Sequence, residues 1–118
     1  MMSHSLQQDV LVITVHEDPG VDGRAGLLTD IGDLVRVRRP AFAVIVLDDD
    51  AATEAVVSVV LRAHRLCSDL GVVLSVAACG APVRRLLEAG ADTRGIRLVI
   101  HARAETAIAT ATALTAAA

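Results

Sequence analysis

Short β-branched runs alternate four times with stretches of helical periodicity along this chain. The runs cover residues 10–16, 42–47, 72–78 and 96–100, and the helical patterns cover residues 22–39, 52–70, 82–90 and 104 onward. Strands that alternate with helices favour a mainly parallel or mixed sheet, here of about four to five strands, with the helices packed on it. The sequence therefore predicts an α/β fold.

The chain has 118 residues, which is the size of one ordinary domain with one core. Neither a linker nor an internal repeat interrupts it. We expect residues 1–8 to be a short N-terminal extension and residues 9–118 to form the single domain. Phe42 is the only aromatic residue, so Val, Leu, Ile and Ala must build the core.

The charge balance argues against nucleic acid as a direct partner. The formal net charge is −3 and the isoelectric point is near 5.7, whereas nucleic-acid binding leaves a basic footprint. The one dense basic cluster, Arg36, Arg38 and Arg39, falls at an expected helix end, where cations interact favourably with the helix dipole. We interpret it as a helix-end feature.

The N-terminal residues lack the pattern of a signal peptide, and no stretch approaches the roughly 18–20 apolar residues of a membrane span. Cys67 and Cys79 are twelve residues apart and form no metal or redox motif. We therefore expect a cytoplasmic protein with reduced thiols and no direct insertion into a membrane.

Catalytic signals are weak. The chain contains no lysine, which excludes P-loop and Schiff-base chemistry, and none of its serines lies in a G-x-S-x-G turn. Polar residues do gather where the expected strands end, and these are His16, Glu17, Asp48, Asp49, Asp50, Cys79 and His101. A small metal- or thiol-dependent enzyme is an alternative interpretation of them, but their spacing favours polar loop starts, with Asp50 helping to begin the next helix. We expect no catalytic residues, no metal and no cofactor.

The helix expected over residues 52–70 is apolar on more than one face. Its inward stripe is Val56, Val60, Ala63, Cys67 and Leu70. Val57 and Leu61 lie on a neighbouring face, beside Glu54, Ser58 and Arg62. Such a helix either docks on another protein or has a broad core stripe, and the pattern alone leaves both open.

Residues 41–107 resemble the STAS domain of bacterial anti-sigma-factor antagonists, and with the first strand and helix the resemblance covers about residues 9–116. The resembling stretches are Ala43–Asp48, Leu61–Arg65, Leu70–Val76, Ala81–Asp92 and Arg103–Ala107. The resemblance rests on their order and spacing together.

This resemblance implies a non-catalytic regulator of transcription. Antagonists of the family bind a kinase-type anti-sigma factor through the loop and helix start after the strand that ends at Asp48, and phosphorylation in that loop ends the binding. The partner implied here is an anti-sigma factor or a related kinase-fold regulatory protein. Homodimer formation is left open, and an accessory STAS subunit of a membrane transport complex is the alternative. The implied partner-binding residues are Asp48, Asp49, Asp50, Thr53, Glu54, Ala55, Val57, Ser58, Leu61 and Arg62.

The sequence departs from the family at the phosphorylation loop. The family pattern is roughly Asp-Ser-Ser-Gly-Leu-Gly, and the second serine receives the phosphate. Counting back from Gly71 places Ala55 at that serine and Glu54 beside it, in a loop about three residues shorter. Either the protein is never phosphorylated there, or Glu54 supplies a fixed negative charge. Thr53 is the nearest candidate for phosphorylation.

Overall fold

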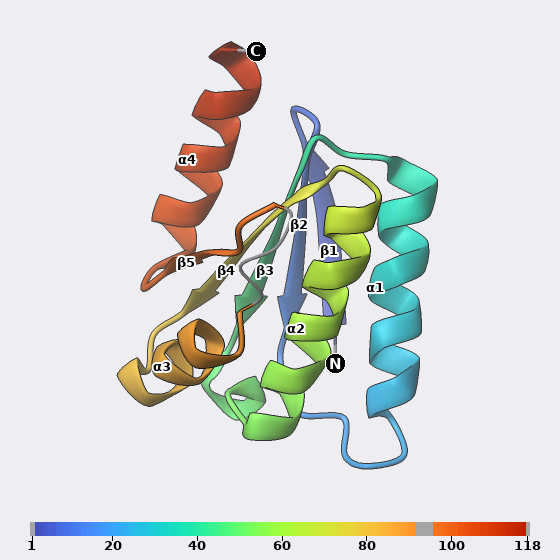
Figure 1. Ribbon diagram of the computed structural model, residues 1–118, viewed down its shortest axis with the longest axis vertical. Helices are drawn as coiled ribbons and strands as arrows, with labels where there is room; N and C mark the ends of the chain where they lie inside the picture. The colour runs from blue at the N-terminus through green and yellow to red at the C-terminus, as the bar shows by residue number, and fades with distance from the viewer. Residues whose placement is uncertain (1, 92–95, 118) are drawn as a thin grey trace.

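The computed structural model describes residues 2–91 and 96–117 and has a five-stranded sheet with helices on both faces (Figure 1). Its elements are β1 (Met2–Gln7), β2 (Val10–Val15), α1 (Arg24–Arg38), β3 (Phe42–Leu47), the 3₁₀ turn η1 (Asp49–Ala51), α2 (Glu54–Asp69), β4 (Val73–Ala78), α3 (Ala81–Gly90), β5 (Val99–His101) and α4 (Ala104–Ala117).

The strands lie in the order β1-β2-β3-β4-β5, and all neighbours from β2 to β5 are parallel. Because each parallel step needs a crossover, a helix lies between each of these strands in the chain. β1 is antiparallel to β2 and makes the sheet mixed. The α/β class and the mixed sheet of about five strands are confirmed.

The N-terminal segment differs from the expectation of a short extension. Met2–Gln7 forms β1, and its ladder with β2 runs from the pair Gln7 and Val10 to the pair Met2 and Val15. The turn consists of Gln8 and Asp9, whose φ angles of 49° and 68° match the primed turns that fit the twist of a hairpin. The sheet therefore starts at residue 2; Met1 lies outside the described residues.

The two faces of the sheet have separate cores. Leu11, Ile13 and Val15 of β2 point toward α1, α2 and α3, whereas Val10 and Val12 point toward α4. This division follows from the two-residue period of a strand. Both faces are apolar because helices cover both, as the continuous runs of β-branched residues predicted.

Helices α1 and α2 lie side by side on one face (Figure 1). A Cβ atom at Gly32 of α1 would come within 2.9 Å of Cδ2 of Leu66 in α2. Glycine at this position therefore lets the two helices approach closely. The predicted inward stripe of α2 is also correct: Val56, Val60, Ala63 and Cys67 are buried, and Leu70 packs partly buried at its end.

The last strand is shorter than expected. We predicted residues 96–100, but β5 covers Val99–His101 because side chains of α2 hold the backbone at residue 96. His64 donates from Nε2 to the carbonyl of Ile96 at 2.7 Å, and Oγ of Ser68 accepts from its N–H at 3.1 Å. Asp92, the last residue of one resembling stretch, lies outside the described residues.

Candidate functional site

The segment between β3 and α2 is held firmly against the end of β2. The N–H of Asp48 donates to the carbonyl of Val15 at 3.0 Å, and the N–H of Asp18 donates to the carbonyl of Asp50 at 3.1 Å. Ala51, the last residue of η1, is fully buried. The backbone of residues 48–51 is thus fixed at the carboxyl edge of the sheet while its three aspartates are exposed.

Thr53 begins helix α2. Its backbone is extended, and its Oγ1 accepts a hydrogen bond from the N–H of Val56 at 3.2 Å, as an N-cap residue does. The same hydroxyl donates to Oδ2 of Asp18 at 2.9 Å. We expected Asp50 to help begin this helix, but Thr53 does so because η1 separates Asp50 from it.

Asp18 joins the two loops at this edge. Its carboxylate accepts hydrogen bonds from Arg24 Nε and Nη2 at 3.2 and 3.0 Å, from the N–H of Gly20 at 2.9 Å and from Thr53. These donors, with Arg24 first, lower the pKa of Asp18 to about 2. The Asp18 carboxylate is therefore charged at neutral pH and fixes α1 and the start of α2 relative to each other.

The sequence reasoning missed this network. Asp18-Pro19-Gly20 has the pattern of an aspartate whose side chain bonds to the backbone two residues on, and that local contact is present. The bond to Thr53 crosses 35 residues of sequence, and no local pattern predicts it.

Six of the predicted partner-binding residues are exposed, and together we call them the acidic face. Its members are Asp48, Asp49, Asp50, Glu54, Ser58 and Arg62. Glu54, Ser58 and Arg62 follow one another at spacing four along α2, so they share one side of the helix. With four carboxylates and one guanidinium, this surface suits a partner that presents basic side chains.

The other four predicted residues are less accessible. Val57 is 4% exposed and belongs to the core, which differs from its expected place on a partner surface. Leu61 is half-buried, and its Cδ1 lies where a Cβ at Gly90 of α3 would be, so it packs against that helix. Thr53 and Ala55 are half-buried at the helix start. The second apolar face of α2 therefore belongs to the core, where α3 covers it.

Two of the strand-end residues meet. Nδ1 of His16, directly after β2, lies 2.8 Å from Oδ2 of Asp48, and Nε2 lies 2.9 Å from Oγ of Ser3 in β1. Cys79 is exposed beside a hollow of about 510 Å³ between the ends of β3 and β4 and the start of α4. Within residues 2–91 and 96–117, no three His, Cys, Asp or Glu side chains are grouped closely enough to hold a metal ion.

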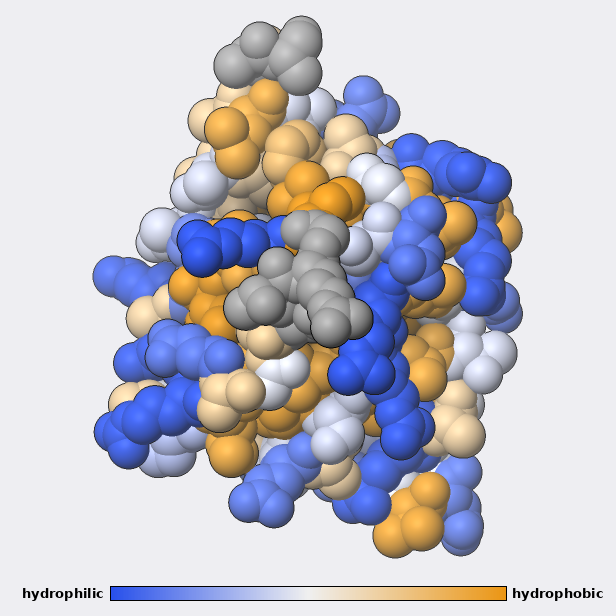
Figure 2. Space-filling model, viewed as in Figure 1, coloured by the Kyte–Doolittle hydropathy of each residue, from blue (hydrophilic) through white to orange (hydrophobic). Residues whose placement is uncertain are grey.

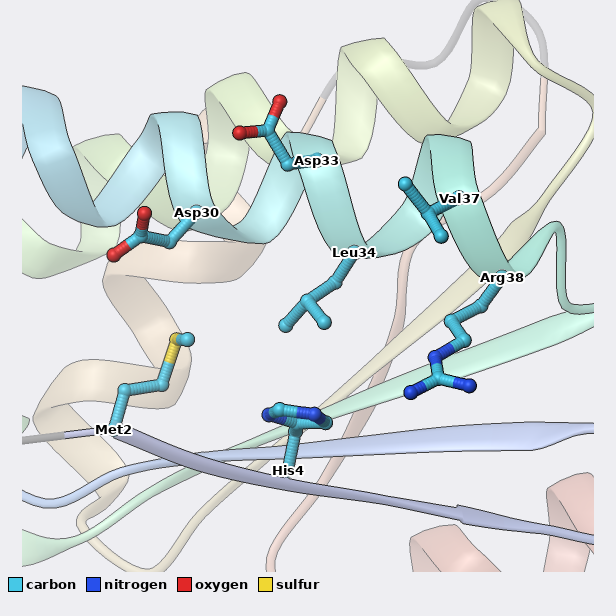
Figure 3. Close-up of a pocket in the computed structure, with 7 residues that line it drawn as sticks. All are labelled: Met2, His4, Asp30, Asp33, Leu34, Val37 and Arg38. Carbon is cyan, nitrogen blue, oxygen red and sulfur yellow. The ribbon is translucent and has the colours of Figure 1, made fainter.

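A shallow groove of about 360 Å³ lies between β1 and α1 (Figure 3). Leu34 points into it toward Met2 and His4, while Asp30 and Arg38 stand toward its two ends. None of the predicted partner-binding residues lines this groove. Apolar atoms elsewhere on the face seen in Figure 2 occur as separate patches among charged side chains.

Among the helices that the structure describes, none is both long and apolar enough to cross a membrane. No protein-family model matches the sequence, and no curated protein matches it.

The structure is similar to that of RsbS S58E from Moorella thermoacetica, whose name carries that protein's own numbering. The TM-score is 0.74 at 17% sequence identity, and the match covers 98% of this chain and 97% of that chain. At this identity the likeness shows the fold alone. The chain has a STAS-like fold over nearly its whole length, which confirms the resemblance at the level of the fold.

Proposed function

We propose that this chain is a non-catalytic regulatory module that docks through its acidic face on a kinase-type anti-sigma factor or a related kinase-fold regulator. It acts in the cytoplasm of a bacterium and influences sigma-factor availability. The observation that carries the proposal is the STAS-like fold over 98% of the chain, shared with RsbS. The fixed backbone of residues 48–51 and the N-cap at Thr53 support it, because a rigid surface loses little entropy on binding.

The negative charge of the acidic face favours a partner whose contact surface is basic. Asp49, Asp50 and Glu54 are exposed and lie within the first turn of α2 or directly before it. A basic surface on the partner would be steered toward them, and the association rate would fall as salt is added.

The first experiment uses the purified protein as bait in its native lysate, with captured proteins identified by mass spectrometry. We expect to capture a kinase-fold anti-sigma factor or sigma regulator. This partner is then purified, and its affinity for the chain is measured by titration calorimetry. Asp49→Arg should weaken its affinity at least about tenfold, since like charges face each other at the contact. Asp33→Arg, a reversal at an exposed aspartate of α1, is the matched control and should leave the affinity within a factor of two.

Two results would contradict the proposal. One is the failure to recover any regulator of that class at micromolar bait. The other is an equal loss of affinity in Asp49→Arg and Asp33→Arg, which would place the contact elsewhere.

In this proposal, docking has no serine switch at residue 55, because Ala55 has no hydroxyl. Thr53 is the nearest candidate for phosphorylation, but its Oγ1 already forms hydrogen bonds with Asp18 and with the N–H of Val56. A phosphate on Thr53 removes the proton that Oγ1 donates to Asp18, and it places its charge beside the Asp18 carboxylate. Incubation with the recovered kinase-type partner and ATP, followed by intact mass, tests this. Any phosphate should disappear in Thr53→Ala, and a phosphate that survives this substitution contradicts the assignment.

A further inference from the structure

Three side chains from three separate strands or strand ends form a continuous hydrogen-bonded chain at the carboxyl edge of β2 and β3. Ser3 lies in β1, His16 follows β2 and Asp48 follows β3. Ser3 pairs with Thr14 in the β1–β2 ladder, so His16, two residues further on, is its diagonal neighbour on the same face of the sheet. Oγ of Ser3 is 2.9 Å from His16 Nε2, and His16 Nδ1 is 2.8 Å from Asp48 Oδ2.

The order of atoms fixes the direction of each hydrogen bond. An ionised carboxylate only accepts, so Nδ1 of a neutral His16 carries the proton and donates it to Asp48. Nε2 is then left with its lone pair, and the Ser3 hydroxyl donates to it. In this tautomer, His16 can take the proton of Ser3 as that oxygen attacks, with Asp48 acting as the positioning residue that holds the ring.

We propose that Ser3 is an activated nucleophile and accepts an acyl group from small activated carboxylic esters. Ser3 Oγ forms a bond to the carbonyl carbon, its proton passes to His16 Nε2, and the ester C–O bond breaks with release of the leaving alkoxide. The proton then leaves His16 for water. The product is a seryl ester, one per chain. The reaction does not rest on the proposed docking, although Asp48 belongs both to this site and to the acidic face.

The exposure of the site to solvent determines which acyl donors reach Ser3 and how fast Ser3 is acylated. The side chains of His16 and Asp48 are 46% and 47% exposed, so a small donor reaches Ser3 from solvent. An activated ester suits such a site because its leaving group departs as an anion without needing a proton. General-base catalysis by a positioned side chain is typically worth about 10²–10⁴-fold. In this wet site we expect the lower limit, roughly a hundredfold.

The chain provides its own control in Ser5. Ser5 lies on the same face of β1, two residues from Ser3, and its Oγ accepts from Nε2 of Gln7 at 3.3 Å. Both hydroxyls are exposed, but Ser3 bonds to an imidazole and Ser5 to an amide. Any difference in their acylation therefore measures the effect of His16.

The test is incubation of the full chain with p-nitrophenyl acetate, followed by p-nitrophenolate release and tandem mass spectrometry. The expected result is one acetyl group on Ser3, removable by hydroxylamine as an ester is. Ser3→Ala should abolish it, and Ser5→Ala should leave the rate unchanged. His16→Gln and Asp48→Asn should slow it, the first about a hundredfold, whereas Asp48→Glu retains the carboxylate and should recover most of the rate.

Acetylation that persists at the wild-type rate in Ser3→Ala, or that falls equally on Ser3 and Ser5, overturns the proposal. A rate unchanged in His16→Gln overturns it as well. Ser3→Ala removes only an exposed hydroxyl, so it tests the proposal even where His16→Gln unfolds. Circular dichroism of each variant establishes that the fold is retained.

Discussion

Replacing Asp18 with asparagine tests whether its carboxylate joins the two loops at the candidate site. Arg24, the N–H of Gly20 and Thr53 lower the pKa of Asp18 from 3.8 to about 2. At about 1.36 kcal/mol per pKa unit, this lowering corresponds to at most about 2.4 kcal/mol of folding free energy at neutral pH. The Asp18 and Arg24 side chains are 16% and 32% exposed, and solvent screening reduces the expected loss in Asp18→Asn to about 1–2 kcal/mol.

The loss should depend on pH with a definite sign. The folded-state pKa lies below the unfolded one, so the stabilisation is complete above about pH 5 and disappears as the pH falls toward 2. At pH 3 about half of it should remain. The gap between wild type and Asp18→Asn should therefore shrink on acidification, because the wild-type Asp18 becomes protonated and is then uncharged, as asparagine always is.

Urea unfolding followed by circular dichroism at pH 7 and pH 3 measures this gap. At pH 7 the midpoint of Asp18→Asn should fall by roughly 0.5–1 M, for a typical dependence on urea of a domain this size. Asp22→Asn, an exposed aspartate in the same loop, removes the same charge and serves as the control. Equal effects of the two substitutions, or a gap that stays constant between the two pH values, would refute the reasoning.

Three further predictions concern α2 and the two thiols. Thr53→Val should lower the free energy of unfolding by about 1 kcal/mol through loss of the N-cap, whereas Thr53→Ser should retain most of the N-cap stabilisation. Urea unfolding of both variants measures the difference. His64→Leu should lower it by about 1 kcal/mol because the carbonyl of Ile96 loses its donor, and faster amide exchange at residues 99–101 should accompany the loss. Burial raises the pKa of the Cys67 thiol to about 11, so iodoacetamide should modify only the exposed Cys79 in the native protein and both thiols in urea, as counted by intact mass; two adducts before unfolding would contradict this.

The parts of the fold predicted from the sequence are those with strong local signals. β3 was predicted with its observed bounds, because a fully apolar run lies between Pro40 and Asp48. The helix patterns also lie where α1 to α4 are found, within about two residues at each described end. β1 was missed because its turn is Gln8–Asp9, which lacks the glycine or asparagine that usually marks a two-residue hairpin.

For the candidate site, the sequence indicates which residues are exposed after the strand, but not how they pack. The exposed acids from Asp48 to Glu54 follow directly from the end of a strand. Periodicity could not decide whether Val57 and Leu61 face a partner or the core, since that depends on where α3 packs. The bonds from Asp18 to Thr53 and from His16 to Asp48 join residues far apart in the chain, so only the tertiary structure brings them together.

The β1–β2 hairpin also bears on the order of assembly during folding. Its turn closes two residues, whereas β2 meets β3 only after the whole of α1 has been crossed. Short loops cost less chain entropy to close, and hairpins form in about 1–10 μs, so β2 can have a paired edge before β3 arrives. That early step depends on Gln8 and Asp9 reaching positive φ, at the end of the sheet opposite the acidic face (Figure 1). The turn that starts assembly and the proposed docking surface thus lie at opposite ends of the sheet.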